Sequence, residues 1–231
     1  MFLAELADGH PRIRRRLDQP VLIYHIPRTG GSFLCNMLQQ LDVLVLHCDV
    51  AGDWEACARA LRGGTRGGLV ILGHTAKDLK AAHRDVSFAE YAVCWRDPFE
   101  ICASEYHGIR NAVPGYHLFD HHLRRECLAC GSLAEWVETY QRNNPISKVL
   151  GDNTPTMLHA MTYARDVEAL LLEVFGLAVD VTRDFGFDPG LFRPGRWAST
   201  VDTAELRRLY ELNREDHELG ADACTLAAGR V

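Results

Sequence analysis

The chain has no long hydrophobic segment: none of its apolar runs approaches the roughly 18 to 20 residues that a membrane-spanning helix needs. It also shows no export signal, since the opening sequence MFLAELADGHPRIRRR places its charges after a very short apolar stretch. We therefore expect neither a membrane span nor a signal peptide. Eight cysteines without such a signal favour reduced thiols and a cytoplasmic location.

Basic residues are fewer than acidic residues in this chain. The sequence holds 25 Lys and Arg residues against 31 Asp and Glu residues, which gives a formal net charge of -6. A protein whose main partner is a nucleic acid needs a broad basic surface that neutralises phosphates. The charge balance therefore argues against a nucleic-acid partner.

Paired metal-ligand motifs are scarce. Cys127 and Cys130 form a single CxxC pair, preceded by His121 and His122 at irregular spacing. Structural zinc sites usually show two well-spaced ligand pairs. We expect the cysteines to pack as small hydrophobic residues and expect no metal site.

Internal repeats and low-complexity tracts are absent, and short apolar runs alternate instead with helical patterns. This order favours an α/β fold with a mostly parallel central sheet flanked by helices. In such folds the functional loops lie at the carboxyl ends of the strands. The expected strands are Val21–His25, Val43–His47, Leu69–Leu72 and Tyr91–Trp95, and the helices between and after them are Ser32–Gln40, Trp54–Leu61 and Pro98–Arg110.

The length of 231 residues fits a single domain, residues 1–231, in which residues 1–20 are an N-terminal extension. Residues 111–131, rich in Gly, Pro, His and aromatics at first and ending beyond the CxxC pair, are interpreted as a substrate-facing insertion. Capping residues and helical stops predict the later elements. These are helices over Ser132–Arg142, over Met161–Phe175 and from Asp202 to about Ala228, with loop structure over Arg183–Ser199.

The segment Tyr24–Phe33, YHIPRTGGSF, joins the first expected strand to a helix. Adjacent glycines let backbone N–H groups turn toward an anion, and the helix adds its positive N-terminal end. Arg28 would add a charged donor, and Thr29 and Ser32 would add hydroxyl groups. The nucleotide-binding pattern GxxxxGK[ST] is absent, which disfavours a phosphotransferase that uses ATP or GTP. The segment predicts a phosphate or sulfate site, with an ordinary strand-to-helix turn as the alternative.

A second motif follows the fourth expected strand. Arg96 ends the strand, Asp97 and Pro98 are typical of a helix start, and Ser104 lies eight residues after Arg96. A strand-end arginine with a helix serine is suited to binding a second phosphate. The alternative is a surface ion pair between Arg96 and Asp97.

His74 follows Gly73 at the end of the third expected strand. A histidine at this edge of a parallel sheet is suited to accepting a proton from a hydroxyl nucleophile at neutral pH. A structural histidine is the alternative. We interpret His74 as a candidate general base because the two expected anion loops end at the same edge.

Together these motifs resemble those of the sulfotransferases, in the branch related to heparan sulfate 2-O-sulfotransferase. Tyr24–Phe33 is similar to the HIPKTGG loop of that branch, and the Arg96–Ser104 segment resembles its 3′-phosphate motif. Gly73-His74, the segment NNPISKVLG and the closing LNREDHEL also resemble family segments. The matches keep the family's order from about Val21 to Ala223.

The chain departs from the family pattern at a few positions. The lysine of the family loop is Arg28 here, which keeps the positive charge but changes its geometry and hydration. The arginine often found five residues after Arg96 is Ile101. His217 and Gly220 stand near positions where the family tends to have a small aliphatic residue and a tyrosine. The change to Arg28 affects how strongly charge in the transition state would be stabilised. The differences at Ile101, His217 and Gly220 mostly affect packing.

The resemblance implies a P-loop-like sulfotransferase fold, with 3′-phosphoadenosine 5′-phosphosulfate (PAPS) as donor and 3′,5′-adenosine bisphosphate as product. It implies that the acceptor is a hydroxyl group of a carbohydrate or a small-molecule natural product, and that no metal is required. It assigns His74 as general base and Arg28 as the group that stabilises charge in the transition state. The implied donor-binding residues are Arg28, Thr29, Gly30, Gly31, Ser32 and Phe33 for the phosphosulfate and Arg96 and Ser104 for the 3′-phosphate. Lys148, Arg193 and Arg196 are secondary candidates, because an Arg- and Gly-rich loop after the main sheet, such as RPGR at Arg193–Arg196, could cover the nucleotide; a solvated surface loop is the alternative.

Two other functions stay open. A non-catalytic nucleotide-binding protein could keep the same fold after arginine replaced the loop lysine. A nucleotide or sugar kinase is the third reading, and the missing GK[ST] sequence weighs against it.

Overall fold

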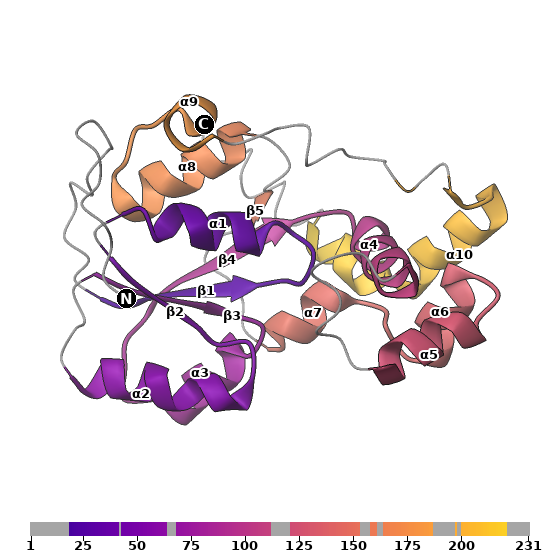
Figure 1. Ribbon diagram of the computed structural model, residues 1–231, viewed down its shortest axis with the longest axis horizontal. Helices are drawn as coiled ribbons and strands as arrows, with labels where there is room; N and C mark the ends of the chain where they lie inside the picture. Colours follow the sequence, from indigo (N-terminus) through magenta and orange to yellow (C-terminus); the bar gives the residue numbers. More distant parts are fainter. Residues whose placement is uncertain are drawn as a thin grey trace. The chain divides into compact units, whose positions relative to one another are not determined.

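The computed structural model describes residues 19–41, 43–63, 68–111, 121–152, 158–160, 164–186, 197 and 200–220 (Figure 1). The chain divides into two compact units, one comprising Met1–Trp95 and Val149–Phe192 and the other comprising Arg96–Lys148 and Arg193–Val231. The expectation of a single domain with an N-terminal extension stays a prediction. Most of that extension, residues 1–18, lies outside the described ranges.

The first unit confirms the predicted α/β class, because helices flank a parallel sheet. In the described residues the sheet has five strands in the order β2-β3-β1-β4-β5, and every neighbouring pair is parallel. The carboxyl ends of the strands therefore share one edge. The strands are β1 (Val21–His25), β2 (Leu44–His47), β3 (Leu69–Gly73), β4 (Ala89–Trp95) and β5 (Leu158–Ala160), of which the first four were predicted from apolar runs.

Helices cover both faces of this sheet (Figure 1). Alternate residues of a strand point to opposite faces, so Val21 and Ile23 of β1 face one layer and Leu22 and Tyr24 face the other. The first layer contains α1 (Gly31–Leu38) and α8 (Ala164–Phe175), whose buried side chains join one core with β1 and β3. The second layer contains α2 (Trp54–Arg62), which follows the short helix η1 (Ala51–Asp53), and α3 (Ala76–Ala82). Strands buried on both faces explain the nearly continuous apolar runs in the sequence.

Several parts of the structure differ from the sequence expectations. The helix α3, the short helix α7 (Pro145–Leu150) and the strand β5 were not predicted. The expected loop from Arg183 begins inside α9 (Val181–Phe185), because the Asp180 side chain accepts a hydrogen bond from the Arg183 backbone N–H at 3.0 Å and caps that helix. The expected insertion contains α5 (His121–Ala129), while residues 112–120 lie outside the described part of the chain.

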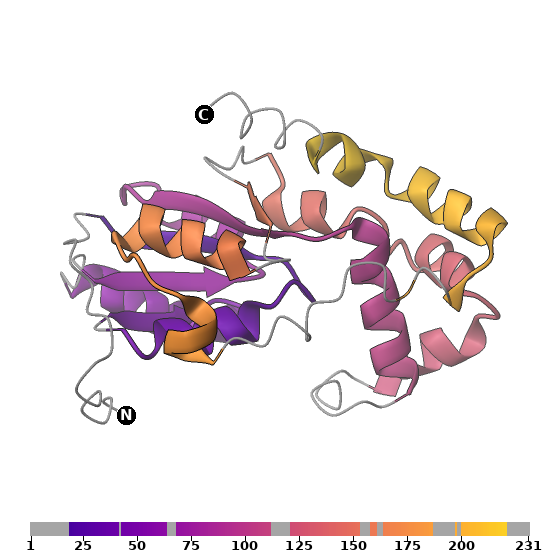
Figure 2. The ribbon, with the colours of Figure 1, turned by 90° about the horizontal axis from the view of Figure 1, so that it is seen from above.

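The second unit is helical in its described part (Figure 2). Its core joins α4 (Pro98–Arg110), α5, α6 (Leu133–Thr139) and α10 (Thr203–Leu212). The predicted caps are confirmed: Ser132 accepts from the Glu135 N–H at 3.1 Å and Asp202 accepts from the Glu205 N–H at 2.8 Å. Each cap satisfies a helix donor that would otherwise lack an acceptor.

Two buried polar side chains connect distant segments of the second unit. The Asn213 side chain accepts from the Asn144 N–H at 2.8 Å, and Asp216 accepts from the N–H groups of Ile146 at 2.8 Å and Ser147 at 2.7 Å. Asn213 and Asp216 are fully buried. Burial raises the pKa of Asp216, while the hydrogen bonds from Ser147 and Ile146 act in the opposite direction. The segments NNPISKVLG and LNREDHEL are therefore held together by buried hydrogen bonds.

We expect Gly73→Ala to destabilise the fold. A Cβ atom on Gly73 would lie 2.1 Å from the carbonyl oxygen of Cys48, so the backbone of β3 or of the β2 end would have to move. The expected loss of unfolding free energy is about 1 to 3 kcal/mol, measured by urea denaturation. Gly52→Ala is the matched control, because a Cβ there meets nothing within 4 Å, and it should change stability by no more than about 0.5 kcal/mol. Equal stabilities of the two variants would contradict the close approach at Gly73.

Candidate functional site

Three polar side chains of the first unit meet at the carboxyl edge of its sheet. His25 is the last residue of β1, His74 directly follows β3, and Asp49 lies two residues after β2. One nitrogen of each histidine and one carboxylate oxygen of Asp49 all lie within 4.8 Å of one another. We call this group the His-Asp-His cluster.

The His74 ring has a defined orientation. Its Nδ1 lies 2.5 Å from the backbone carbonyl oxygen of His25. A carbonyl oxygen can only accept, so Nδ1 carries the proton in this contact. In the neutral ring, Nε2 then has the lone pair and can accept a proton. Nε2 lies 3.8 Å from Oδ1 of Asp49, so a positive charge formed on the ring would be stabilised by the carboxylate.

The backbone holds Asp49 beside His74. The His74 N–H donates to Oδ1 of Asp49 at 3.2 Å. On the other side, Oδ2 of Asp53 accepts from the N–H groups of Asp49 at 3.0 Å and Val50 at 3.1 Å, which closes the turn after β2. The Thr75 hydroxyl and N–H both donate to the Cys48 carbonyl, at 2.6 Å and 2.9 Å. The ends of β2 and β3 are thus joined by several hydrogen bonds.

His25 lies against His74, with ring centroids 4.6 Å apart and an interplanar angle of 31°. Burial and the neighbouring His74 lower the pKa of His25 to about 4, so this ring is neutral near pH 7. Its Nδ1 is buried and has no hydrogen-bond partner within the described part of the chain. On its other side, a Cβ on Gly31 would lie 1.7 Å from Nε2 of His25, so only glycine leaves room for this ring.

His47 connects the cluster to α1. Its Nδ1 lies 3.5 Å from Oδ2 of Asp49, and its Nε2 lies 2.9 Å from Sγ of Cys35. Asp49 first, and then Cys35, raise the pKa of His47 to about 10. Burial alone would raise the pKa of Asp49, but the contact with His47 and the charge of His74 outweigh burial and lower it to about 2. Asp49 therefore stays ionised near pH 7.

The segment after β1 has the backbone expected of a tight strand-to-helix turn. Arg28 has a φ of 68° and Gly30 has a φ of 95°, both in the left-handed region, and Gly30 is the N-cap of α1. The Thr29 hydroxyl donates to the Ile26 carbonyl at 2.7 Å, and the residue is buried. Ser32 lies in the first turn of α1. Phe33 packs against the core between α1, α8 and the sheet.

The second unit contains the other predicted anion-binding residues. Arg96 donates through Nη2 to Oε2 of Glu100 at 3.2 Å, and Glu100 is 3% exposed. Oε1 of Glu100 accepts from the Trp197 N–H at 3.1 Å. Ser104 is half-buried on α4. An anion bound at Arg96 would therefore share its guanidinium with a buried carboxylate.

The secondary candidates for donor binding are Lys148, Arg193 and Arg196. The Nζ of Lys148 donates to the carbonyl of Gln141 and, at 3.1 Å, to Oδ1 of Asn143. These bonds give Lys148 a role in holding the turn before α7. Arg193 and Arg196 lie outside the described residues.

The CxxC pair is part of a helical core. Cys127 and Cys130 are buried among α4, α5 and α6, and Nη1 of Arg110 donates to their carbonyl oxygens at 2.7 Å and 3.1 Å. Burial raises the pKa of Cys127 to about 12. The thiol therefore stays protonated at neutral pH, whereas metal ligation needs a thiolate.

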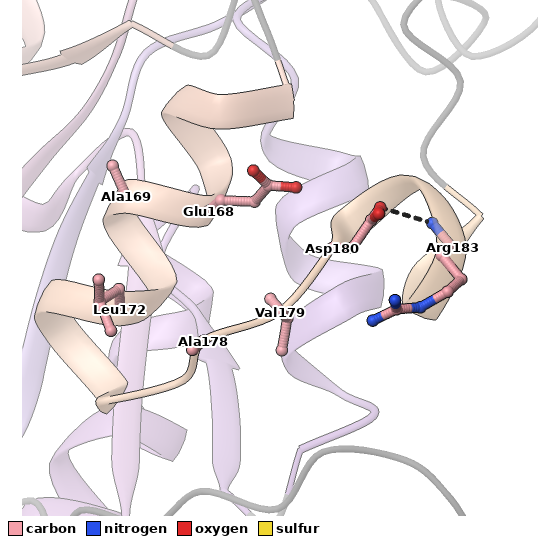
Figure 3. A pocket seen from close by; sticks show the side chains of 7 residues that line it. All are labelled: Glu168, Ala169, Leu172, Ala178, Val179, Asp180 and Arg183. Atoms are coloured by element: carbon pink, nitrogen blue, oxygen red, sulfur yellow. Dashed lines mark hydrogen bonds between the residues drawn. The ribbon is translucent and has the colours of Figure 1, made fainter.

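A cavity of about 470 Å³ lies between α8, α9 and the segment that connects them (Figure 3). Its wall combines Ala169, Leu172 and Val179 with the charged side chains of Glu168 and Arg183. Of the predicted site residues that the structure describes, none lines it.

No family model, curated protein or solved structure matches the chain. The site is therefore defined by its own geometry and by the motifs in the sequence. A parallel α/β sheet is shared by proteins of many functions, so the fold does not select among them.

Sequence reasoning found His74 but missed its partners His25, Asp49 and His47. A usable signal was present, because each of these residues ends or closely follows an apolar strand, as His74 does. Parallel strands bring such residues to one edge whether or not they belong to a motif.

We expect the titration of His47 to depend on Asp49. The contribution of this contact to stability is fully present between pH 3.8, the ordinary pKa of Asp49, and pH 6.5, the ordinary pKa of His47, and it is lost as the pH rises through about 10. On the acidic side it is lost as the pH falls from 3.8 through about 2, where Asp49 gains a proton. Asp49→Asn should move the titration midpoint of His47, measured by NMR, down toward 6.5. Asp85→Asn, at an exposed position, is the control; an unchanged midpoint in Asp49→Asn would contradict the assignment.

Proposed function

We propose that the protein is a sulfotransferase that uses PAPS and transfers the sulfuryl group to a hydroxyl of a carbohydrate or small-molecule natural product. The observation that carries this proposal is the orientation of His74. Its Nδ1 is engaged by the His25 carbonyl, which leaves Nε2 as proton acceptor with Asp49 beside it. The resemblance of Tyr24–Phe33 and Arg96–Ser104 to sulfotransferase motifs supplies the substrate class.

The turn before α1 fits a phosphosulfate group. Left-handed backbone at Arg28 and Gly30 turns the chain into a helix of eight residues, so the positive end of α1 follows the loop directly. The Arg28 side chain adds a full positive charge. The Thr29 hydroxyl is engaged by Ile26, so binding would use its backbone N–H. Arg96 and Ser104 stay the residues predicted for the 3′-phosphate, on the strength of the motif.

In the proposed reaction the donor supplies a sulfuryl group bonded through oxygen to the 5′-phosphate, and 3′,5′-adenosine bisphosphate is released. His74 accepts the proton of the acceptor hydroxyl at Nε2 while the hydroxyl oxygen forms the new bond to sulfur. The bond from sulfur to the bridging oxygen breaks, and that oxygen leaves on the 5′-phosphate of the bisphosphate product. Asp49 stabilises the resulting imidazolium, and the His25 carbonyl keeps the ring in place. Arg28 stabilises negative charge on the sulfuryl and bridging oxygens.

The direct test combines transfer and binding measurements. The protein is incubated with radiolabelled PAPS and a panel of sugars and small hydroxyl compounds, and binding of 3′,5′-adenosine bisphosphate is measured by calorimetry. Labelled product together with bisphosphate binding supports the proposal. Bisphosphate binding with no turnover for any acceptor favours the non-catalytic nucleotide-binding protein. Binding of ATP with Mg²⁺ but not of the bisphosphate favours a kinase.

We expect His74→Ala to reduce turnover by about 100- to 10,000-fold, the usual contribution of a general base, and to leave the bisphosphate Kd unchanged. His74→Asn separates chemistry from structure, because its side-chain amide can still donate toward the His25 carbonyl but cannot act as base. His83→Ala, in the turn after α3, is the control. Turnover at the level of this control in both His74 variants would remove His74 from the base role.

We expect the charge of Arg28 to matter more than its shape. Arg28→Met should lower turnover by about 100- to 1,000-fold, which is typical of losing one group that stabilises transition-state charge. Arg28→Lys keeps the positive charge and places the lysine of the family loop at this position, so it should retain most of the wild-type turnover. The comparison is made by steady-state kinetics at saturating donor. Equal losses in the two variants would show that the guanidinium geometry, not its charge, is required.

A further inference from the structure

The His-Asp-His cluster has the composition of a metal site as well as that of a general base. It combines two imidazole nitrogens with one carboxylate, all within 4.8 Å of one another. Zinc binds such ligands at about 2.0 to 2.2 Å in tetrahedral geometry, which places neighbouring ligand atoms roughly 3.3 to 3.6 Å apart. The 3.8 Å between Nε2 of His74 and Oδ1 of Asp49 is close to this range. Binding would require side-chain rotations that bring all three ligand atoms, which lie within 4.8 Å of one another, into this range.

The surroundings of His74 fit metal binding. Histidine ligands usually donate their other ring N–H to a carbonyl or carboxylate, which fixes the tautomer and aims the free nitrogen at the ion. His74 makes this contact through Nδ1 to the His25 carbonyl. Asp49 has a similar outer partner, since its Oδ2 lies 3.5 Å from His47 while Oδ1 faces Nε2 of His74.

His25 supplies an independent observation. Among the residues that the structure describes, none is a hydrogen-bond partner of its buried Nδ1, and an unsatisfied buried polar atom is unfavourable unless something binds it.

We propose that His25, Asp49 and His74 bind a divalent transition-metal ion, with zinc the best match to two nitrogen ligands and one oxygen ligand. Three protein ligands leave the fourth tetrahedral position open to water. The ion binds through the Nε2 lone pair of His74, which the proposed transfer reaction needs for the acceptor proton. Bound zinc therefore inhibits that reaction, a consequence that rests on the proposed function, whereas the binding itself does not.

Binding is tested on the intact protein without donor or acceptor. Zinc is titrated in competition with a chromophoric chelator, and cobalt is used to obtain the visible spectrum of the site. The expected result is one strong site per chain with a tetrahedral cobalt spectrum that lacks thiolate charge-transfer bands. Absence of a site, or a spectrum dominated by thiolate bands, would overturn the proposal.

Variants identify the ligands. Asp49→Asn and His74→Gln should each weaken zinc binding by more than about 10- to 100-fold, the loss that removal of an outer partner alone produces. His83→Gln controls for loss of a histidine, and the double variant Cys127→Ser/Cys130→Ser controls for the CxxC pair. Both controls should keep the wild-type affinity, with folding of every variant checked by circular dichroism. Unchanged binding in Asp49→Asn and His74→Gln, or a loss confined to the cysteine variant, contradicts the site.

Inhibition is tested separately, with an acceptor found in the transfer assay. One equivalent of zinc should abolish transfer, and a chelator should restore it. Full transfer with zinc bound would overturn the inhibitory consequence. If the protein transfers no sulfuryl group, the binding titration still decides the metal site, so failure of the proposed function and failure of the metal site give different results.

Discussion

The hydrogen bond from the His74 ring to the His25 carbonyl is the contact on which the candidate site depends. It joins the end of β3 to the end of β1, fixes which nitrogen of His74 carries the proton, and brings the two imidazole rings together. Asp49 completes the arrangement through the His74 backbone N–H. Both chemical roles considered for the cluster, proton acceptance and metal binding, follow from the single lone pair that this contact leaves on Nε2.

The same edge of the sheet is also constrained by close packing. Gly73 lies so near the Cys48 carbonyl that a side chain would overlap it, and the Thr75 hydroxyl and N–H donate to that same oxygen. These contacts set the distance between the turn that carries Asp49 and the residue that follows β3. The geometry of the cluster is thus a result of strand packing, and the polar groups are positioned before any ligand binds.

Much of the fold could be predicted from the sequence because its physical signals are local. Apolar runs such as Val21–His25 must be buried on both faces, and cap residues such as Ser132 satisfy helix donors wherever they occur. The strand Leu158–Ala160 could not be predicted, since three residues carry no periodic pattern and their pairing depends on β4. For α5, packing against α4 and α6 in the core decides the conformation, and its own sequence is too polar to indicate this.

The candidate site, like the fold, could be predicted from the sequence only in part. His74 could be found because it belongs to a motif, while His25 and Asp49 become partners only through the strand order that places β1 and β2 on either side of β3.

The sequence also suggested one purpose for the paired glycines of the loop, close approach to an anion. The structure gives Gly31 another, because the His25 ring occupies the space of its missing side chain. The two glycines therefore have separate tasks: Gly30 sets the backbone turn, and Gly31 leaves room for the ring. Since the ring is in contact with the loop, the imidazole proton resonances of His25 are a natural spectroscopic reporter of whatever occupies that loop.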